Sequence, residues 1–286
     1  YLFMKPELTI ILLLKERQSY TSRFIEYFLK NNLGYNLFIS DGSKRKLEPK
    51  ILNKIKKNSK ITYRKFREDK NYKIYHKKIL LSLQMVKTKF VCFACNDDFL
   101  IYPTLYKCMR ILKKDKKLNG AGGTIYNFSL KRDLKSNFYL SDVKPLYLRN
   151  NFNQSSKITR VKYFLKNFKS TMHYIMNRKN LIKCYKESSK HFHFNIELKD
   201  HFIDLNNIII GGIKIINSPI LFHEAIPNSE SSKRPNLIIN NLGKKNFIED
   251  VIKLSKLISN KIKMDNLELF KEYYSNSLHP IMKNIE

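Results

Sequence analysis

The chain has 286 residues and a formal net charge of +31, from 55 lysine and arginine residues against 24 aspartate and glutamate residues. A hydrophobic fraction of 43% and an aromatic fraction of 13% exclude an intrinsically disordered chain and are typical of a globular protein with a large core. No apolar stretch approaches the roughly 20 residues that a membrane-spanning helix needs.

The basic charge by itself favours binding to a polyanion. However, 44 of the 55 basic residues are lysines scattered along the chain, and the codon usage of an AT-rich genome would produce the same excess. Nucleic-acid-binding proteins depend more on the forked guanidinium of arginine. We therefore expect a solvated basic surface, with an anionic substrate or an anionic membrane face as the functional alternatives.

The first part of the chain alternates strand-like and helix-like segments. Residues 8–14 form a continuous apolar run that predicts a strand buried on both faces. Apolar residues at helical spacing follow over residues 24–29, and a second strand is predicted over residues 35–40, ending at Asp41-Gly42-Ser43. This order predicts a βαβ unit with an acid at the carboxyl end of its second strand.

The same alternation continues to a second acidic group. A helix over residues 51–55, an edge strand over 61–63 and a helix over 75–86 precede a strand over residues 90–95. Asn96-Asp97-Asp98 closes that strand, and residues 103–112 predict the next helix. Ligands of parallel α/β sheets bind at the carboxyl ends of the strands, so we expect Asp41, Asp97 and Asp98 to lie close together.

The second half is less regular. Residues 131–170 are polar and basic, and we interpret them as a variable or flexible insert. Strands are predicted over residues 173–176 and 208–216, and helices over residues 181–185, 194–205 and from residue 244 onward. The last helix is amphipathic and basic, which suits either docking on its own domain or, less favoured, a membrane surface.

Four cysteines occur in apolar or helical surroundings. Cys92 and Cys95 have the spacing of a redox pair, but the motif lies inside a predicted strand and no second pair accompanies it. We expect all four to be buried free thiols in a reducing, cytoplasmic environment, in preference to a redox or metal role.

The motifs resemble those of glycosyltransferases with the GT-A fold, in particular bacterial family-2-like enzymes. The similarity is carried by the segment from Leu8 to Arg17, by Phe38 to Ser43 and by Phe90 to Leu100. It implies an α/β fold of GT-A type, with a mostly parallel central sheet flanked by helices and with C-terminal helices. It also implies a domain over residues 1–235, divided into a nucleotide-donor half (1–125) and an acceptor half (126–235), with a helical segment over 236–286.

The resemblance implies a metal-dependent enzyme of polysaccharide biosynthesis that moves a sugar from a nucleotide-sugar donor to a glycan or lipid-linked acceptor, with inversion at the anomeric carbon. Mn²⁺ or Mg²⁺ would neutralise the leaving diphosphate. Asn96 departs from the acid usual in this family, so Asp98 is expected to bind the metal. The implied roles are as follows: donor binding by Arg17, Asp41, Lys77 and Asp97; metal binding by Asp98 and His223; and general-base catalysis by Glu197, with Asp200 second.

Each of these residues also has an ordinary structural interpretation. Asp-Gly is a common turn, Asp98 is placed to cap the next helix, and Glu197 and Asp200 could be solvated acids on a helix. Two other functions remain as alternatives. A sugar nucleotidyltransferase is disfavoured because residues 15–19 lack the glycine-rich loop that grips a nucleoside triphosphate. A nucleic-acid-binding protein is disfavoured because no recognisable binding motif accompanies the charge. We expect a cytoplasmic protein, with peripheral contact to the inner membrane face as a further expectation.

Overall fold

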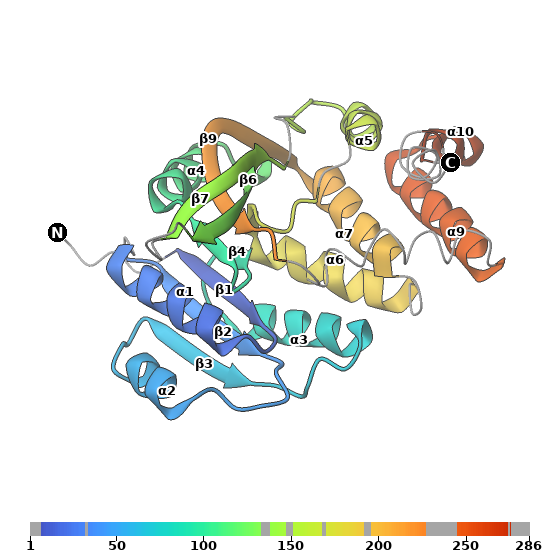
Figure 1. Ribbon diagram of the computed structural model, residues 1–286. Helices are drawn as coiled ribbons and strands as arrows, with labels where there is room; N and C mark the ends of the chain where they lie inside the picture. The colour runs from blue at the N-terminus through green and yellow to red at the C-terminus, as the bar shows by residue number, and fades with distance from the viewer. Residues whose placement is uncertain are drawn as a thin grey trace.

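The computed structural model describes residues 7–31, 34–132, 138–146, 151–167, 170–191, 196–226, 245–273 and 275. Within these ranges the protein forms one nine-stranded mixed sheet with helices around it (Figure 1). Eight strands follow the order β3-β2-β1-β4-β8-β6-β9-β5, and β7 pairs with β6 beside this path. The α/β fold with a central sheet flanked by helices, predicted from the sequence, is confirmed.

The first half is a regular alternation of parallel strands and helices. Strand β1 pairs in parallel with both β2 and β4, and β2 pairs in parallel with β3. All seven residues of β1 are buried, which explains why it is apolar throughout instead of alternating. The elements are β1 (Leu8–Leu14), α1 (Gln18–Asn31), β2 (Asn36–Asp41), α2 (Pro49–Lys56), β3 (Ile61–Lys65), α3 (Tyr72–Met85) and β4 (Phe90–Ala94).

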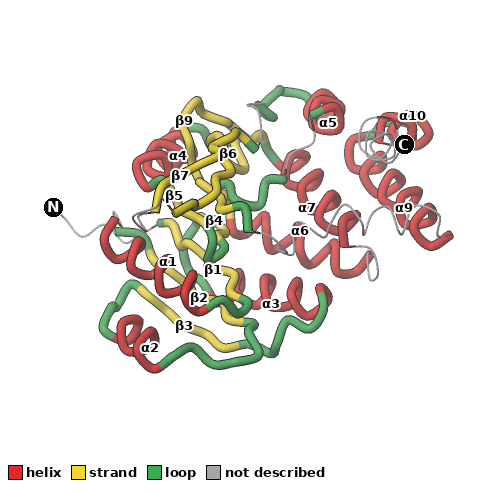
Figure 2. The backbone as a smooth tube through the Cα atoms, in the orientation of Figure 1, coloured by secondary structure: helices red, strands yellow, loops and turns green. Residues whose placement is uncertain are grey.

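The second half mixes strand directions. Strands β6 and β9 are parallel, whereas β8 is antiparallel to β4 and β6, β5 is antiparallel to β9, and β7 is antiparallel to β6. The elements are β5 (Asp98–Leu100), α4 (Tyr102–Lys114), β6 (Leu118–Arg132), β7 (Phe138–Pro145), α5 (Lys157–Lys166), β8 (Ile175–Asn177), α6 (Arg178–His191), α7 (Ile196–Ile210), β9 (Gly212–Glu224), α9 (Lys245–Ile262) and α10 (Asn266–Tyr273). Figure 2 shows α6, α7, α9 and α10 gathered beside the sheet, and each packs against the next.

Two local predictions are wrong. The segment 131–170, interpreted as an insert, contains β7 and α5 within its described residues. Residues 208–210, predicted as the start of a strand, form the last turn of α7. The guanidinium of Arg160 donates hydrogen bonds to the carbonyls of Ile208 and Ile209, at 2.8 and 3.2 Å. These bonds satisfy carbonyls that the helix itself leaves unpaired, so the β-branched residues stay helical.

The predicted division at residue 125 falls inside β6, so one continuous sheet crosses it. Of the predicted helical segment 236–286, the described residues form α9 and α10. Among the described residues, none of the helices has both the length and the apolar character that a membrane span requires.

Candidate active site

The loop between β1 and α1 has an unusual backbone. Glu16 and Arg17 adopt positive φ angles of 57° and 60°, a region that residues other than glycine seldom occupy. The side-chain amide of Asn96 holds this loop in place, because its Nδ2 donates to the carbonyls of Glu16 and Arg17 at 3.1 and 3.2 Å. It also lies 3.1 Å from the Thr21 hydroxyl. The amide therefore fixes the conformation that places the Arg17 side chain.

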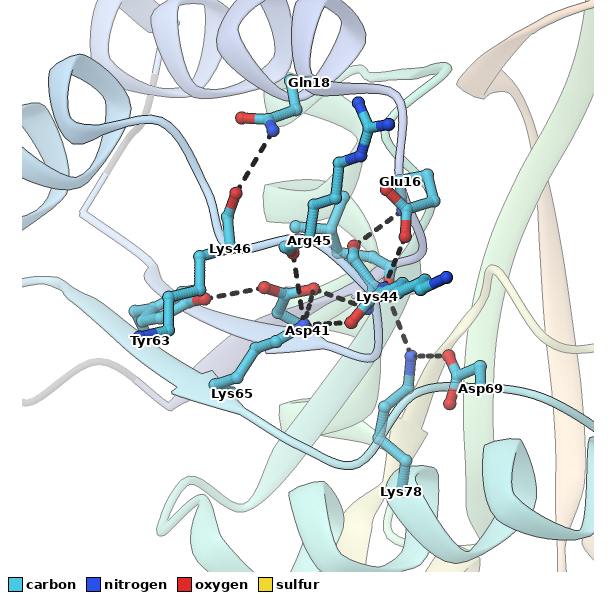
Figure 3. Close-up of polar contacts among 12 residues, drawn as sticks. Glu16, Gln18, Asp41, Lys44, Arg45, Lys46, Tyr63, Lys65, Asp69 and Lys78 are labelled. Carbon is cyan, nitrogen blue, oxygen red and sulfur yellow. Dashed lines mark hydrogen bonds and ion pairs between the residues drawn. The ribbon is translucent and has the colours of Figure 1, made fainter.

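Asp41 is fully buried at the carboxyl end of β2. Its Oδ2 accepts a hydrogen bond from the Tyr63 hydroxyl at 2.6 Å, and its Oδ1 accepts one from the Ser43 amide at 2.8 Å. Lys65 Nζ lies 3.4 Å from Oδ1 (Figure 3). Burial, followed by the Asp41 carboxylate, raises the pKa of the Tyr63 hydroxyl, so the phenol stays protonated and continues to donate. These contacts give Asp41 a fixed orientation at the carboxyl end of the parallel strands.

A buried ion pair supports the turn after Asp41. Lys78, on α3, pairs with Asp69 and donates to the Leu14 carbonyl at 3.1 Å (Figure 3). The turn must approach this pair closely, since a Cβ atom on Gly42 would lie 2.2 Å from the Asp69 carboxylate. Lys78 therefore contacts the end of β1 directly and the turn after β2 through Asp69, whose amide donates to the Gly42 carbonyl at 2.8 Å.

Asp97 faces the β1–α1 loop across the site. Its Oδ2 accepts a hydrogen bond from the Arg17 guanidinium at 2.9 Å. Its Oδ1 is buried and has no hydrogen-bond partner among the described residues. Burial and the neighbouring Asp98 carboxylate raise the pKa of Asp97.

Asp98 opens β5, a short strand that the sequence did not predict, and lies opposite His223 of β9. Its Oδ1 is 2.7 Å from His223 Nδ1, and its Oδ2 accepts a hydrogen bond from the Cys95 amide at 2.6 Å. Burial opposes ionisation of Asp98, but the rings of His173 and His223 outweigh it and hold the carboxyl pKa below its usual value. Burial likewise opposes a charge on His223, but the hydrogen bond with Asp98 raises its pKa.

The residues around Asp97 fit a divalent cation. Ligand atoms of Cys95, Asp97 and Asp98 all lie within 4.8 Å of one another. The unpaired Oδ1 of Asp97 is the kind of buried anionic atom that a metal ion satisfies. Both oxygens of Asp98 have a hydrogen-bonding neighbour, but each keeps a lone pair that an ion could use, so Asp97 and Asp98 can both face the cation.

The residues predicted for the acceptor side lie on α7 and α3. Asp200 Oδ1 is 3.3 Å from Nε2 of the buried His76, and Asp200 lines a small cavity together with Phe93 and Tyr185. Glu197 lies in the first turn of α7, and its side chain lies outside the described part of the chain. Lys77 is exposed on α3, in contrast to the buried Lys78 beside it in sequence.

The structure joins Arg17 to Asp97 and Asp98 to His223, and Asp41 lies at the carboxyl end of β2, the strand next to β1. It adds residues that sequence reasoning missed, namely Tyr63, Lys65, Asp69 and Lys78, and it gives the Asn96 amide a structural role. A further ion pair joins Arg23 of α1 to Glu224 at the end of β9, and the Arg23 guanidinium stacks 4.8 Å from the Phe99 ring. No sequence motif marks these partners, because they are distant in the chain and meet only through the sheet order.

Neither a scan against protein-family models nor a search of curated proteins found a match to the chain. Solved structures do match. A crystal structure of S. aureus TarS aligns with a TM-score of 0.61 and 12% identity, over 96% of this chain and 44% of that chain. TarS residues 1–349 in complex with UDP-GlcNAc align with a TM-score of 0.59 and 11% identity, over 94% of this chain and 71% of that chain.

The fold is that of a GT-A glycosyltransferase. TarS 1–349 in complex with UDP aligns at a TM-score of 0.56 and 13% identity, over 95% of this chain and 72% of that chain. The chain thus spans less than half of the first TarS structure and about seven tenths of the truncated ones. At such low identity the likeness concerns the fold, and it confirms the GT-A type predicted from the sequence.

Proposed function

We propose that the protein is a nucleotide-sugar-dependent glycosyltransferase, family-2-like, that uses a divalent cation. The observation that carries this proposal is the buried, unpaired Oδ1 of Asp97 beside Arg17, at the same sheet edge as Asp41. An unpaired carboxylate oxygen beside a guanidinium suits a ligand that brings both a cation and an anion, which a metal diphosphate does. The TarS complexes with UDP-GlcNAc and UDP make a uridine nucleotide the first donor to test.

Asp41 and its neighbours would bind the nucleoside of the donor, and Arg17 and Asp97 would bind its diphosphate. Asp41, buried at the end of β2 and held by Tyr63 and Lys65, would accept a hydrogen bond from a nucleoside N–H or hydroxyl that displaces one of these donors. Arg17 would contact the diphosphate with the N–H groups that Asp97 does not use. A bound Mn²⁺ or Mg²⁺ would neutralise the charge that grows on the diphosphate as the glycosidic bond breaks.

The acceptor hydroxyl must lose a proton as it attacks the anomeric carbon with inversion. We propose that an acid in the first turns of α7, Glu197 or Asp200, takes it. Asp200 is supported by its place in the cavity beside Phe93, which lies two residues before Cys95. Transfer should be lost in whichever of Glu197→Gln and Asp200→Asn removes the base, with donor binding unchanged. If both variants turn over at the wild-type rate, the base lies elsewhere.

The deciding experiment is a thermal-shift screen of UDP, GDP, ADP and CDP, each with Mn²⁺, with Mg²⁺ and with EDTA. We expect one nucleotide to stabilise the protein only when a cation is present, since ligands that bind the native state raise the melting temperature. Asp97→Asn should remove the cation-dependent part. Asp115→Asn, an exposed acid after the far end of α4, is the matched control. Equal shifts with and without EDTA would refute the cation.

We propose a glycan or lipid-linked acceptor, and the net charge of +31 suits an acceptor or membrane surface that is anionic. Binding to nucleic acid is the competing interpretation of the same charge. A filter-binding titration with single-stranded and duplex DNA at two salt concentrations separates them. Tight binding that falls steeply with salt, together with no nucleotide shift, would favour the nucleic-acid function.

A further inference from the structure

Cys95 occupies the position where β4 ends and the acidic group begins. The Asp98 amide donates to the Cys95 carbonyl at 3.2 Å, and the Asp98 carboxylate accepts from the Cys95 amide at 2.6 Å. These two bonds fold residues 95–98 into a tight turn. The turn brings the Cys95 side chain back toward the carboxylates that follow it in the sequence.

The side chains of residues 95–98 point to different partners. Asn96 is committed to the β1–α1 loop, and Asp98 is committed to His223 and the Cys95 amide. Cys95 Sγ lies in one cluster with one carboxylate oxygen each of Asp97 and Asp98, all within 4.8 Å of one another. Sulfur and oxygen atoms at such separations can share one ion after small side-chain rotations.

An independent observation indicates that this cluster takes a cation. Asp97 is only 4% exposed, yet its Oδ1 has no hydrogen-bond donor in the described part of the chain. A buried carboxylate oxygen without a donor destabilises the native state, because it has lost its hydration, and a bound cation offsets this desolvation penalty. The oxygen belongs to the same residue that completes the cluster with Cys95.

We propose that Cys95 Sγ is a ligand of the cation site, together with Asp97, and that it shifts the site's preference from Mg²⁺ toward softer divalent ions such as Zn²⁺ and Co²⁺. Binding breaks the S–H bond, releases the proton to solvent and forms a metal–sulfur bond. Thiolate ligands favour Zn²⁺ and Co²⁺, whereas a site of carboxylates and water alone suits Mg²⁺ and Mn²⁺. This inference rests on the proposed function for the placement of the diphosphate, but the metal–sulfur bond can be measured without nucleotide.

The other three cysteines provide an internal comparison. Cys92, Cys108 and Cys184 are each at most 1% exposed, whereas Cys95 is half-buried. Burial raises the pKa of the Cys108 and Cys184 thiols to about 12 and also raises that of Cys92. The expectation of four buried thiols therefore holds for three of them, and Cys95 is the accessible one among the four.

The first test is the absorption spectrum of the Co²⁺-loaded protein without nucleotide. We expect a sulfur-to-cobalt charge-transfer band in the wild type that is absent in Cys95→Ser and retained in Cys184→Ser, a matched control far along the chain in α6. In the same variant the preference for Zn²⁺ over Mg²⁺ should fall by about tenfold or more, the scale on which single groups around a metal change its affinity. Co²⁺ binding without the band, or a band that persists in Cys95→Ser, would overturn the proposal.

A second test needs no variant. Alkylation of the native wild-type protein, followed by peptide mass spectrometry, reports the labelling rate of Cys95. Zn²⁺ should slow this rate strongly and Mg²⁺ should not, whereas equal rates with both ions contradict a sulfur ligand. Failure of the two proposals is distinguishable. A nucleotide shift that needs Mg²⁺, with unprotected Cys95, refutes the thiol ligand alone, whereas a cobalt–sulfur band without any nucleotide shift refutes the glycosyltransferase alone.

Discussion

Replacing Asn96 with aspartate would restore the acid usual in the resembling family, and a motif-based argument expects this change to improve metal binding. The structure predicts the opposite. Asn96 Nδ2 donates to the carbonyls of Glu16 and Arg17, the two residues with positive φ. A carboxylate has no proton to donate, so Asn96→Asp would place a negative charge against two carbonyl oxygens in a site that is 5% exposed.

The magnitude follows from these contacts. The Glu16 carbonyl loses the Asn96 donor, the Arg17 carbonyl keeps the Thr21 amide and hydroxyl, and a charge faces both. Together these changes destabilise the native state by about 2–5 kcal/mol at neutral pH. The Thr21 hydroxyl already donates to the Arg17 carbonyl at 3.1 Å, so it could serve the new carboxylate only by giving up that bond. Asn96→Ala is the matched control, because it loses the same hydrogen bonds without adding a charge.

Stability is measured by urea unfolding with far-ultraviolet circular dichroism, since the chain has no tryptophan. The new carboxyl has a folded-state pKa above the unfolded value of about 3.9, because it is buried among oxygens. The destabilisation caused by the charge is therefore absent below the unfolded-state pKa. It grows as the pH rises toward the folded-state pKa and stays constant above it. We expect Asn96→Asp to lose more stability than Asn96→Ala at pH 7.5 and to approach it at pH 5. A stability equal to the wild type at pH 7.5, or a gap that does not change with pH, would refute the role of the amide.

Three other substitutions test the supports of the site. Lys78→Met leaves the buried Asp69 carboxylate without its partner and should cost about 3–5 kcal/mol at pH 7, measured by the same urea titration; a change below 1 kcal/mol would contradict a charged pair. Gly42→Ala places a Cβ atom 2.2 Å from the same carboxylate and should cost about 1–3 kcal/mol by overpacking, with wild-type stability as the contrary result. Arg160→Met removes the donors to the last carbonyls of α7 and should lower stability by at least about 3 kcal/mol, whereas Arg160→Lys should recover only part of it.

The parallel half of the fold was predictable because its signals are local. A strand buried on both faces is apolar throughout, and β1 and β4 are recognisable for that reason. The second half, which mixes parallel and antiparallel pairs, was less predictable, because its strand pairs join segments distant in sequence. Strand β5 has three residues, and only its pairing with β9 makes Asp98 part of a strand.

The same distinction holds within the site. Arg17, Asp41 and Asp97 follow strands whose carboxyl ends meet at one edge, so their proximity was predictable from the order of elements alone. Lys78 was not distinguishable from Lys77, since the choice between adjacent lysines depends on which face of α3 turns to the sheet. Tyr63 gave no signal either, because its hydroxyl reaches Asp41 only through the β2–β3 register.

The four residues from Cys95 to Asp98 show that a sequence motif does not by itself identify which of its residues are placed to bind a metal ion. A linear comparison ranks them by acidity and selects Asp98 as the metal ligand. The turn, however, gives both Asp98 oxygens to other donors and gives the Asn96 amide to the neighbouring loop. Asp97 Oδ1 has no hydrogen-bond partner among the described residues, and Cys95 Sγ lies in one cluster with carboxylate oxygens of Asp97 and Asp98. The proposal connects the departures from the family pattern: Asn96 supports the β1–α1 loop, and Cys95, one residue earlier, would supply the ligand that an acid at position 96 does not.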